Sequence, residues 1–485
     1  MTLPPVQRIR IWSIASLIVA ILVGVQIAEG SLFWPLVVGC VLATIMLVQS
    51  QPLKIGTILV GIVLLGYVVG NRGFAQLSLA GNIPLLPAEF VLLVAGAILI
   101  FKTLAKKVSP VPTDLLNLAL LTWIVLSSLR LVMDLRTYGF FALRDFAAVY
   151  YAGFFFIAQD AGRTASERRF LSNSLLLATG ALLVVSPCYE LFPLFFQDHL
   201  TIRGVPLIYL KGDLVGTFAA AGTLLFFAIF DRAGSRTCLV ISVALAALAM
   251  STNNRSSMAA LMLVSLLFIC CRRWRYVLTM SAGALAAVAI ILAVAFARNR
   301  PWQDTPVYDA YERVASLADP LGQGNYSGKE TFYKGDNNTF RWVWWRLTYE
   351  NTVHTNPYFG LGWGYDLAEA FEQIYYPEGS DEFAARSPHS IYVNLFGRTG
   401  LLGLVPFVVF TCAVIARAFR SIRSRQESGY LWAATLVILV SASFGVVLEG
   451  PMGAVVFWSM LGLASAYDVH RSIPPAAAET QTAVA

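Results

Sequence analysis

The 485-residue sequence has few charged residues and lacks the signatures of metal and nucleotide chemistry. Only 13% of the residues are charged and 57% are hydrophobic, with a mean hydropathy of +0.67, a composition outside that of soluble domains. A DxD sequence, a GxSxG elbow, a P-loop and an HExxH helix are all absent. Any chemistry that the protein performs is therefore expected to need no metal and no nucleotide cofactor.

Cysteine is also scarce, and its positions give no sign of a disulfide framework or a zinc site. No CxxC pair occurs, and the six cysteines lie in or beside apolar segments: Cys40, Cys188, Cys238, Cys270, Cys271 and Cys412. We interpret them as packing residues. A cleavable targeting peptide is not expected, because Arg8 and Arg10 precede an apolar run that resembles an uncleaved span. The net charge of +7 needs no nucleic acid, since it lies mainly in short loops.

Long apolar segments are abundant. Their length of about 17 to 25 residues is what a helix needs to cross a hydrocarbon core of roughly 30 Å. They predict an all-α polytopic membrane protein with about 14 transmembrane helices. The predicted spans lie near residues 11–28, 31–49, 55–70, 86–104, 114–132, 145–160, 169–192, 214–230, 237–253, 257–271, 275–297, 390–416, 430–447 and 451–468.

The basic residues predict the orientation of these spans. With the N-terminus inside, 19 of the 35 Lys and Arg residues fall in inside segments and seven in short outside segments. The remainder belong to one long loop and the helix after it. This excess follows the positive-inside rule, so we expect both termini in the cytoplasm and the long loop outside.

The long loop, residues 298–388, predicts a folded cap. It contains 19 Trp, Tyr and Phe residues, whereas disordered segments lack aromatics. Three helix starts are expected along it, at Thr305 before Pro306, at Asn338 or Thr339, and at Asp366 with Glu369. We expect four regions: N-terminal membrane helices (1–297), a mostly helical cap (298–388), C-terminal membrane helices (389–470) and a disordered tail (471–485).

His389 is the strongest candidate for chemistry. It follows Ser387 and Pro388 at the mouth of an apolar helix. An imidazole with a pKa near 6.5 can take a proton from a hydroxyl at neutral pH, a role worth about 10²–10⁴ in rate. A hydrogen-bonded structural role is the alternative, and His199 and His354 are weaker competitors.

Arginines expected on the same side are candidates for anion binding. Arg203 precedes the span near 214 and Arg255 lies at an outer helix junction. The planar guanidinium suits a phosphate, although snorkelling at the interface would also explain an Arg at a helix end. Arg398 lies inside an apolar helix, where it is either functional or paired with a carboxylate such as Glu449.

Two other basic residues are further possible anion contacts. Lys211 stands just before the span near 214, and Arg144 belongs to a cluster of charges beside Asp145. The Arg144 cluster could equally be an ion-paired loop. The cap as a whole contains 8 Lys and Arg against 13 Asp and Glu, a net charge of −5. This charge favours a neutral or amino-sugar ligand over a strongly acidic one.

Three stretches in this order resemble the O-antigen ligase and O-antigen polymerase (Wzy-type) superfamily of membrane glycan ligases and polymerases. They are NNRSSMAALML around Arg255, RxxxW followed by NPYFGLGWG between Arg341 and Gly364, and PHSIYVNLFGRTGLLGL after the long loop. The resemblance covers roughly residues 200–420. It implies a GT-C-like fold in the bacterial inner membrane, with the cap in the periplasm.

The resemblance also implies an activity. It implies metal-independent, inverting transfer of a glycan from undecaprenyl diphosphate to a glycan or lipid A core acceptor, without a cofactor. His389 would deprotonate the acceptor hydroxyl, and Arg255 and Arg203 would stabilise the leaving diphosphate. Beside these carried-over roles, we expect four further basic residues to contact the substrates: Arg341, Arg398, Lys211 and Arg144.

Two rival interpretations stay open. A transporter or flippase of lipid-linked oligosaccharide would also suit fourteen helices, but the sequence shows no internal repeat, and transporters seldom need a large aromatic outer loop. A non-catalytic assembly partner is the other. Within the first interpretation, polymerase and ligase are both open, and the number of spans leans towards a polymerase.

Overall fold

The computed structural model describes residues 54–78, 86–106, 112–252, 254–317, 319, 331–375 and 386–471. These residues are predominantly helical. The only strands among them are β1 (Thr201–Ile202) and β2 (Val205–Pro206), which pair as a short antiparallel hairpin. The expected disordered tail lies almost entirely outside the described residues.

The helices that form the body of the protein follow the predicted spans. They are α3 (Ile55–Leu65), the π-helix η1 (Gly66–Gly70), α4 (Asn71–Ala75), α5 (Pro87–Lys106), α6 (Leu115–Tyr138), α7 (Phe140–Asp145), α8 (Ala147–Tyr150), α9 (Gly153–Ala161), α10 (Ala165–Leu191), α11 (Gly212–Ala233), α12 (Arg236–Ser251), α13 (Arg255–Cys270), α14 (Trp274–Ala297), α18 (Ile391–Arg423), α19 (Gly429–Ala442) and α20 (Pro451–Arg471). A second π-helix, η2 (Phe195–His199), precedes the hairpin.

Eight helices or continuous helix runs in the described residues are long and apolar enough to cross a membrane. Three others, α12, α13 and α19, are apolar but shorter. The spans predicted near residues 11–28 and 31–49 lie outside the described residues. The structure therefore shows an all-α polytopic protein, and the total of fourteen crossings stays a prediction.

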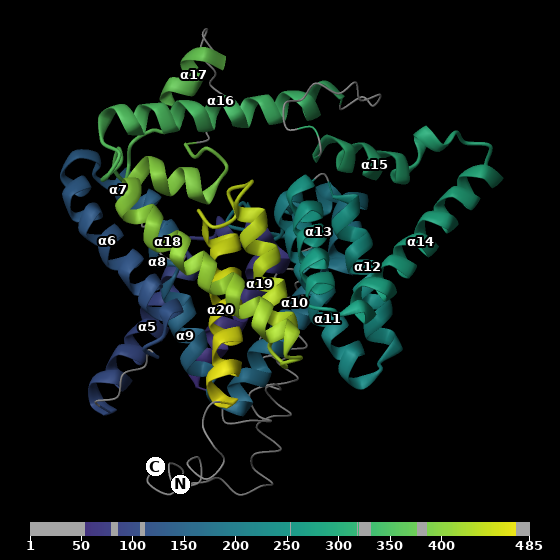
Figure 1. Cartoon of the computed structure of the whole chain (residues 1–485), viewed down its shortest axis with the longest axis horizontal. Helices are drawn as coiled ribbons and strands as arrows, with labels where there is room; N and C mark the ends of the chain where they lie inside the picture. The colour runs from purple at the N-terminus through teal and green to yellow at the C-terminus, as the bar shows by residue number, and fades with distance from the viewer. Residues whose placement is uncertain are drawn as a thin grey trace, which may run out of the picture.

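The core lies where α11, α19 and α20 meet the surrounding helices. Most of α11 is buried, and it packs against α10, α12 and α19, while α20 packs against α9 and α19. Gly222 of α11 shows how close these helices lie, because a Cβ atom there would be 2.8 Å from the Thr179 Cβ of α10. Small residues at helix contacts are typical of membrane bundles. In contrast, α14 leans away from the bundle (Figure 1).

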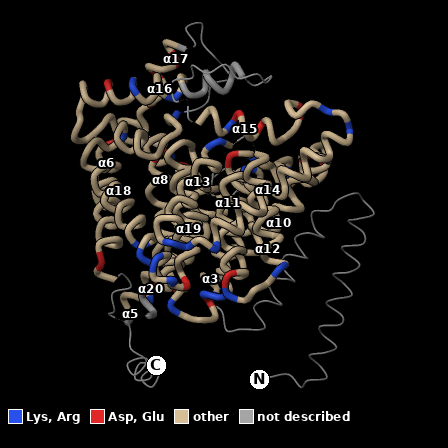
Figure 2. Tube along the Cα trace, turned by 45° about the vertical axis from the view of Figure 1, so that its right-hand side comes forward, with Lys and Arg blue, Asp and Glu red and all other residues tan. Residues whose placement is uncertain are grey.

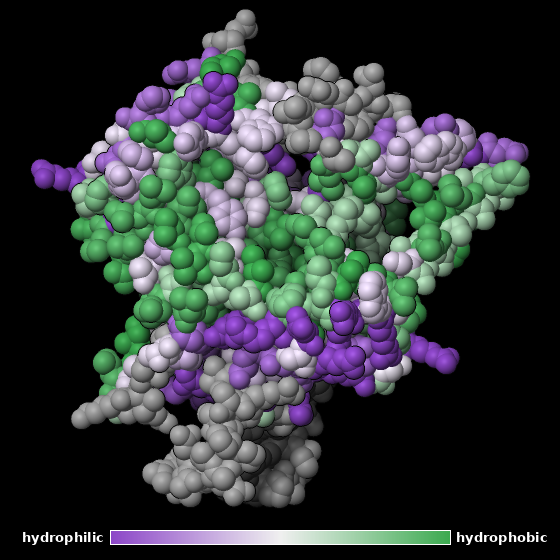
Figure 3. Space-filling view, viewed as in Figure 1, coloured by the Kyte–Doolittle hydropathy of each residue, from purple (hydrophilic) through white to green (hydrophobic). Residues whose placement is uncertain are grey.

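The surface has the layered polarity of a membrane protein. Figure 3 shows a hydrophobic belt between a hydrophilic band near the base and a second one at the cap. Figure 2 shows Lys and Arg gathered at the lower rim, below the membrane helices and opposite α16 and α17. This arrangement fits a bilayer that surrounds the belt.

The cap consists mainly of η3 (Trp302–Asp304), α15 (Pro306–Leu317), α16 (Thr331–Thr355) and α17 (Glu369–Tyr375), with α16 lying across the ends of the membrane helices (Figure 1). Thr305 opens α15, as predicted. The prediction for α16 was wrong, because the helix begins at Thr331 and not at Asn338 or Thr339. Before α17, the Ala368 amide donates to the Asp366 carboxylate.

The NPYFGLGWG loop is joined to the start of α18. Four backbone hydrogen bonds of 2.7–3.1 Å connect residues 357–362 with residues 397–402. α18 is kinked at Gly400, where φ is 59° and ψ is −156°. A Cβ atom there would lie 2.5 Å from the Tyr358 carbonyl carbon, and one on Gly360 would lie 2.6 Å from that of Arg398. Glycine at both positions lets the backbones meet, so the cap supplies hydrogen-bond partners at the kink.

Candidate active site

His389 occupies a strained turn immediately before α18. Its φ is 56°, a left-handed conformation that residues other than glycine rarely adopt. Two neighbouring tryptophans of α16 hold this turn. The Trp344 ring lies 5.5 Å from the imidazole, centroid to centroid, and the Trp345 indole N–H donates to the Pro388 carbonyl at 2.6 Å. The buried Nδ1 atom of His389 has no hydrogen-bond partner among the described residues.

Two cavities involve this turn, one through Trp345 and the other through His389 itself. The first, which we call the apolar cavity, has a volume of about 450 Å³ and is bordered by α13, α15, α16 and Phe444. Its walls include Met262, Leu263, Trp342 and Trp345, and two guanidinium groups, those of Arg255 and Arg341, also line it. Because Trp345 is bonded to Pro388, this cavity directly adjoins the turn that presents His389.

The second cavity, which we call the polar cavity, has a volume of about 410 Å³ and includes His389 itself in its lining. Seven further lining residues are acidic or basic, namely Arg72, Arg144, Asp145, Lys211, Arg386, Arg398 and Glu449. His389 therefore lines the polar cavity while its neighbour Pro388 is bonded to the wall of the apolar one.

The surroundings of His389 keep its imidazole neutral. Burial, followed by the positive charges of Arg341 and Lys211, lowers the pKa of His389 to about 4. Burial and the nearby charge of Arg255 lower the pKa of Arg341 to about 10, so Arg341 is still protonated at pH 7. The two arginines are thus like charges at one site, an arrangement that an anion would stabilise.

Arg255 is held in place by its position at the start of α13. The preceding Asn254 caps the helix through a 3.0 Å bond from the Ser256 amide. The Arg255 guanidinium donates to the Ser316 hydroxyl of α15 at 3.2 Å. Nearby, Arg313 donates to three carbonyl groups at the C-terminal end of α12, which anchors α15 to the membrane helices.

Arg398 is buried in a network of protein partners. Its guanidinium pairs with Asp145 of α7 at 2.6 Å and donates to Asn394 at 2.8 Å and to the Tyr365 carbonyl at 3.1 Å. The carboxylate partner is Asp145, whereas the sequence pointed to Glu449. Glu449 lies beside it in the polar cavity, where burial raises its pKa to about 7.

The structure brings six of the seven predicted site residues to the two cavities. His389, Lys211, Arg144 and Arg398 line the polar cavity, and Arg255 and Arg341 line the apolar one. Arg203 lines neither. It is exposed at the turn between β1 and β2, with a φ of 52°, so the geometry does not place it with Arg255.

Other lining residues were not predicted. Arg72, Arg386 and Trp345 border the cavities but were not chosen from the sequence. Arg72 could have been predicted, because a cation at the outer end of a span disagrees with the positive-inside tendency. Arg255 was selected for the same reason. No group of three or more His, Cys, Asp or Glu side chains suited to a metal occurs within the part of the chain that the structure describes.

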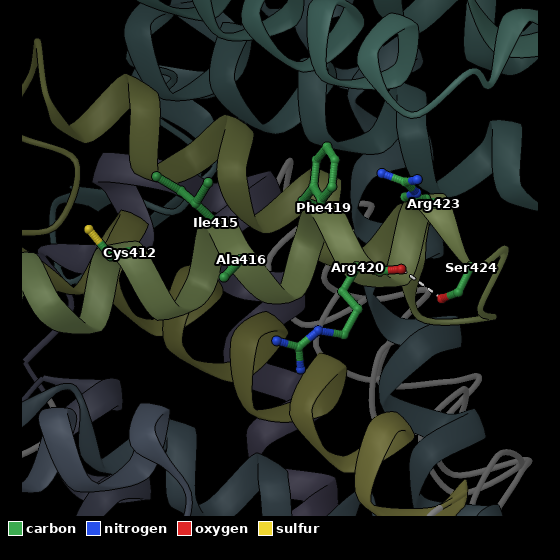
Figure 4. Close-up of a pocket in the computed structure, with 7 residues that line it drawn as sticks. All are labelled: Cys412, Ile415, Ala416, Phe419, Arg420, Arg423 and Ser424. Carbon is green, nitrogen blue, oxygen red and sulfur yellow. Dashed lines mark hydrogen bonds between the residues drawn. The ribbon is translucent and has the colours of Figure 1, made fainter.

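A third cavity, of about 910 Å³, runs along α18 between Cys412 and Ser424 (Figure 4). Its described lining comes from this one helix and its C-cap residue, Ser424. At 1.5 Å per residue, even the Cys412 end of this cavity lies on the order of 30 Å along α18 from Ile391, the first residue of the helix, which closely follows His389. This cavity is therefore separate from the candidate active site.

Comparison with known families identifies part of the chain. Residues 239–408 match the model of a family described as O-antigen ligase. The matched segment extends from α12 into α18 and contains Arg255, Arg341, Trp345 and His389. A search of curated proteins found no match to the chain.

Proposed function

Because its residues 239–408 place this protein in the O-antigen ligase and polymerase superfamily, we propose that it transfers a glycan from undecaprenyl diphosphate to a hydroxyl of a glycan or of lipid A core. The family and the apolar helices indicate a multi-pass protein of the bacterial inner membrane that handles lipid-linked glycans. The proposal adds the donor, the acceptor, a metal-independent inverting reaction and the residues responsible.

The observation that carries the proposal is that His389 lines the polar cavity while the residue before it is bonded to Trp345 in the wall of the apolar cavity. The apolar cavity suits the isoprenoid chain of a lipid donor, and its two guanidinium groups suit the diphosphate. We assign the diphosphate to Arg255 and Arg341. Arg203 was expected to share this role but lies outside both linings. The polar cavity suits the acceptor, which would then meet the donor at His389.

This placement supports a single displacement at the anomeric carbon. The acceptor hydroxyl gives its proton to His389 while its oxygen attacks the anomeric carbon. The bond from that carbon to the diphosphate oxygen breaks, and the diphosphate leaves with the bonding electrons. Attack from the side opposite the leaving group inverts the configuration. Arg255 and Arg341 stabilise the negative charge that develops on the diphosphate.

Bound donor would also make His389 a better base. In the protein alone, burial and then the charge of Arg341 disfavour protonation of the imidazole. A diphosphate beside Arg341 offsets this charge, so the pKa of His389 would rise towards its ordinary value near 6.5. Base strength would therefore increase when the donor is in place.

The orientation follows the same proposal. We place both termini in the cytoplasm and the cap, residues 298–388, in the periplasm over the membrane regions 1–297 and 389–470. The basic rim opposite α16 and α17 in Figure 2 supports this orientation, since basic residues favour the cytoplasmic side.

The test is a reaction of purified protein with an undecaprenyl-diphosphate-linked glycan, with and without lipid A core, followed by separation of products by size. A ladder formed without the core indicates a polymerase, and a product formed only with the core indicates a ligase. His389→Ala should abolish either product. His354→Ala, which changes an exposed histidine at the end of α16, is the matched control. A folded, membrane-inserted His389→Ala protein with normal activity would refute the proposal.

A further inference from the structure

The polar cavity has more positive than negative side chains in its lining. Five are cationic, namely Arg72, Arg144, Lys211, Arg386 and Arg398, and two are carboxylates, Asp145 and Glu449. A neutral sugar does not need such an excess, because its hydroxyls can bond to uncharged donors and acceptors.

Three of the five cations already have a carboxylate partner. Arg398 pairs with Asp145 at 2.6 Å, Arg386 with Asp366 at 2.7 Å and Lys211 with Asp213 at 3.0 Å. Asp366 and Asp213 do not line the cavity. Their ion pairs therefore offset part of the positive charge without adding a carboxylate to the lining.

The other two cations, Arg72 and Arg144, have no carboxylate partner among the described residues. They reach the cavity from separate elements, Arg72 from α4 and Arg144 from the last turn of α7. The Arg72 guanidinium lies over the Tyr209 ring, 5.5 Å from its centroid. This contact holds the guanidinium in position and leaves its N–H edge available to a ligand.

In the described part of the chain, unpartnered groups and a helix terminus also border the cavity, and the carboxylate oxygen Oε1 of Glu449 is among the unpartnered atoms. The buried Nε of Arg386 has no acceptor among the described residues. Lys211 stands at the N-cap of α11, a helix of 22 residues whose N-terminal end carries a partial positive charge. The positive potential from the cationic side chains and the helix terminus therefore favours an anion, and the free Arg386 N–H adds one donor.

We propose that the polar cavity binds the acceptor through an anionic substituent, a carboxylate or a phosphate, held by Arg72 and Arg144 so that a neighbouring hydroxyl faces His389. This inference rests on the proposed function, whose acceptor it specifies. It differs from the expectation of a neutral glycan, which used the net charge of the whole cap. A bound glycan meets the lining of the cavity, and there the balance is positive.

The test compares three acceptor glycans that differ at one position, which carries a hydroxymethyl, a carboxylate or a phosphate group. With purified wild-type protein, we expect kcat/KM to be roughly 10- to 100-fold higher for an anionic acceptor than for the neutral one, the range that one or two charged hydrogen bonds provide. A preference for the carboxylate indicates an acidic sugar, and a preference for the phosphate indicates a phosphorylated core sugar.

The variants Arg72→Gln and Arg144→Gln should each reduce this anionic-to-neutral ratio. Arg136→Gln should keep it, because Arg136 is an exposed arginine in the last turn of α6 that lies outside the lining. Equal kcat/KM for all three acceptors would overturn the inference. So would an increased donor KM in the Arg72 and Arg144 variants with an unchanged ratio, because these arginines would then bind the diphosphate. A wild-type protein that transfers nothing to any acceptor contradicts the proposed function instead.

Discussion

Trp345→Phe tests whether a residue in the wall of the apolar cavity positions His389 in the polar cavity. The indole ring lines the apolar cavity, and its N–H group bonds the Pro388 carbonyl at 2.6 Å. The next residue, His389, has a φ of 56°, which costs on the order of 1–3 kcal/mol for a residue with a side chain. The bond from Trp345 is one of the contacts that hold the turn in this conformation. Phenylalanine keeps an aromatic ring in the cavity wall but cannot make the bond.

The expected loss is that of one hydrogen bond. A net contribution of about 1–2 kcal/mol, which includes some of the cost of an unpaired carbonyl, corresponds to a roughly 5- to 30-fold lower kcat if the reactive position of His389 becomes less populated. The KM for the donor should change little, because the ring still borders the cavity. The assay is steady-state transfer by purified protein, with kcat and donor KM measured separately.

Trp363→Phe is the control. It removes a bond of the same kind, from an indole N–H to the Ser127 carbonyl at 3.2 Å, from a fully buried tryptophan outside both cavity linings. It should lower thermal stability while the folded protein keeps its kcat. A wild-type kcat for Trp345→Phe, or an equal loss in both variants at matched folding, would show that the Trp345 bond does not position His389.

Three other predictions concern charge and backbone. Arg341→Gln removes a cation that lowers the pKa of His389, so that pKa should rise above about 4 and the acid limb of the kcat/KM profile should move to higher pH; an unmoved limb would contradict the assigned cause. Gly400→Ala should prevent stable folding in a thermal melt, since its Cβ would lie 2.5 Å from a backbone carbonyl at a φ of 59°, whereas Gly96→Ala, with no atom within 4 Å, should be tolerated. Arg398→Ala should destabilise the protein by about 3–5 kcal/mol by leaving a buried carboxylate unpaired; a normal melting temperature with lost activity would instead make it a substrate contact.

Much of the architecture was predictable because it depends on local composition. Apolar length predicted the helices, and the Thr305-Pro306 pair correctly predicted the start of α15. The start of α16 was missed because Asn338 and Thr339 are typical caps, yet the helix continues through them from Thr331. Capping residues indicate where a helix can begin and do not prevent an earlier start.

The site depended on contacts between distant segments, which spacing along the sequence does not reveal. Gly360 and Gly400 stand in two glycine-rich stretches that the sequence shows. The sequence does not show that the backbones of these two stretches meet. The same holds for the pairing of Arg398 with Asp145, since Glu449 was an equally reasonable partner. Arg203 resembled a diphosphate ligand in the sequence, whereas the fold brings Arg341 of the cap to Arg255.

The central claim is that His389, in the lining of the polar cavity, takes the acceptor proton. The most direct measurement is single-turnover transfer by purified wild-type and His389→Gln proteins, with free undecaprenyl diphosphate and transferred glycan quantified together. The account predicts equal amounts of both products from the wild type, and a rate roughly 10²–10⁴-fold lower for the variant with donor affinity retained. A variant that reacts at the wild-type rate, or a wild type that moves the lipid-linked glycan across a vesicle without releasing the diphosphate, would contradict it.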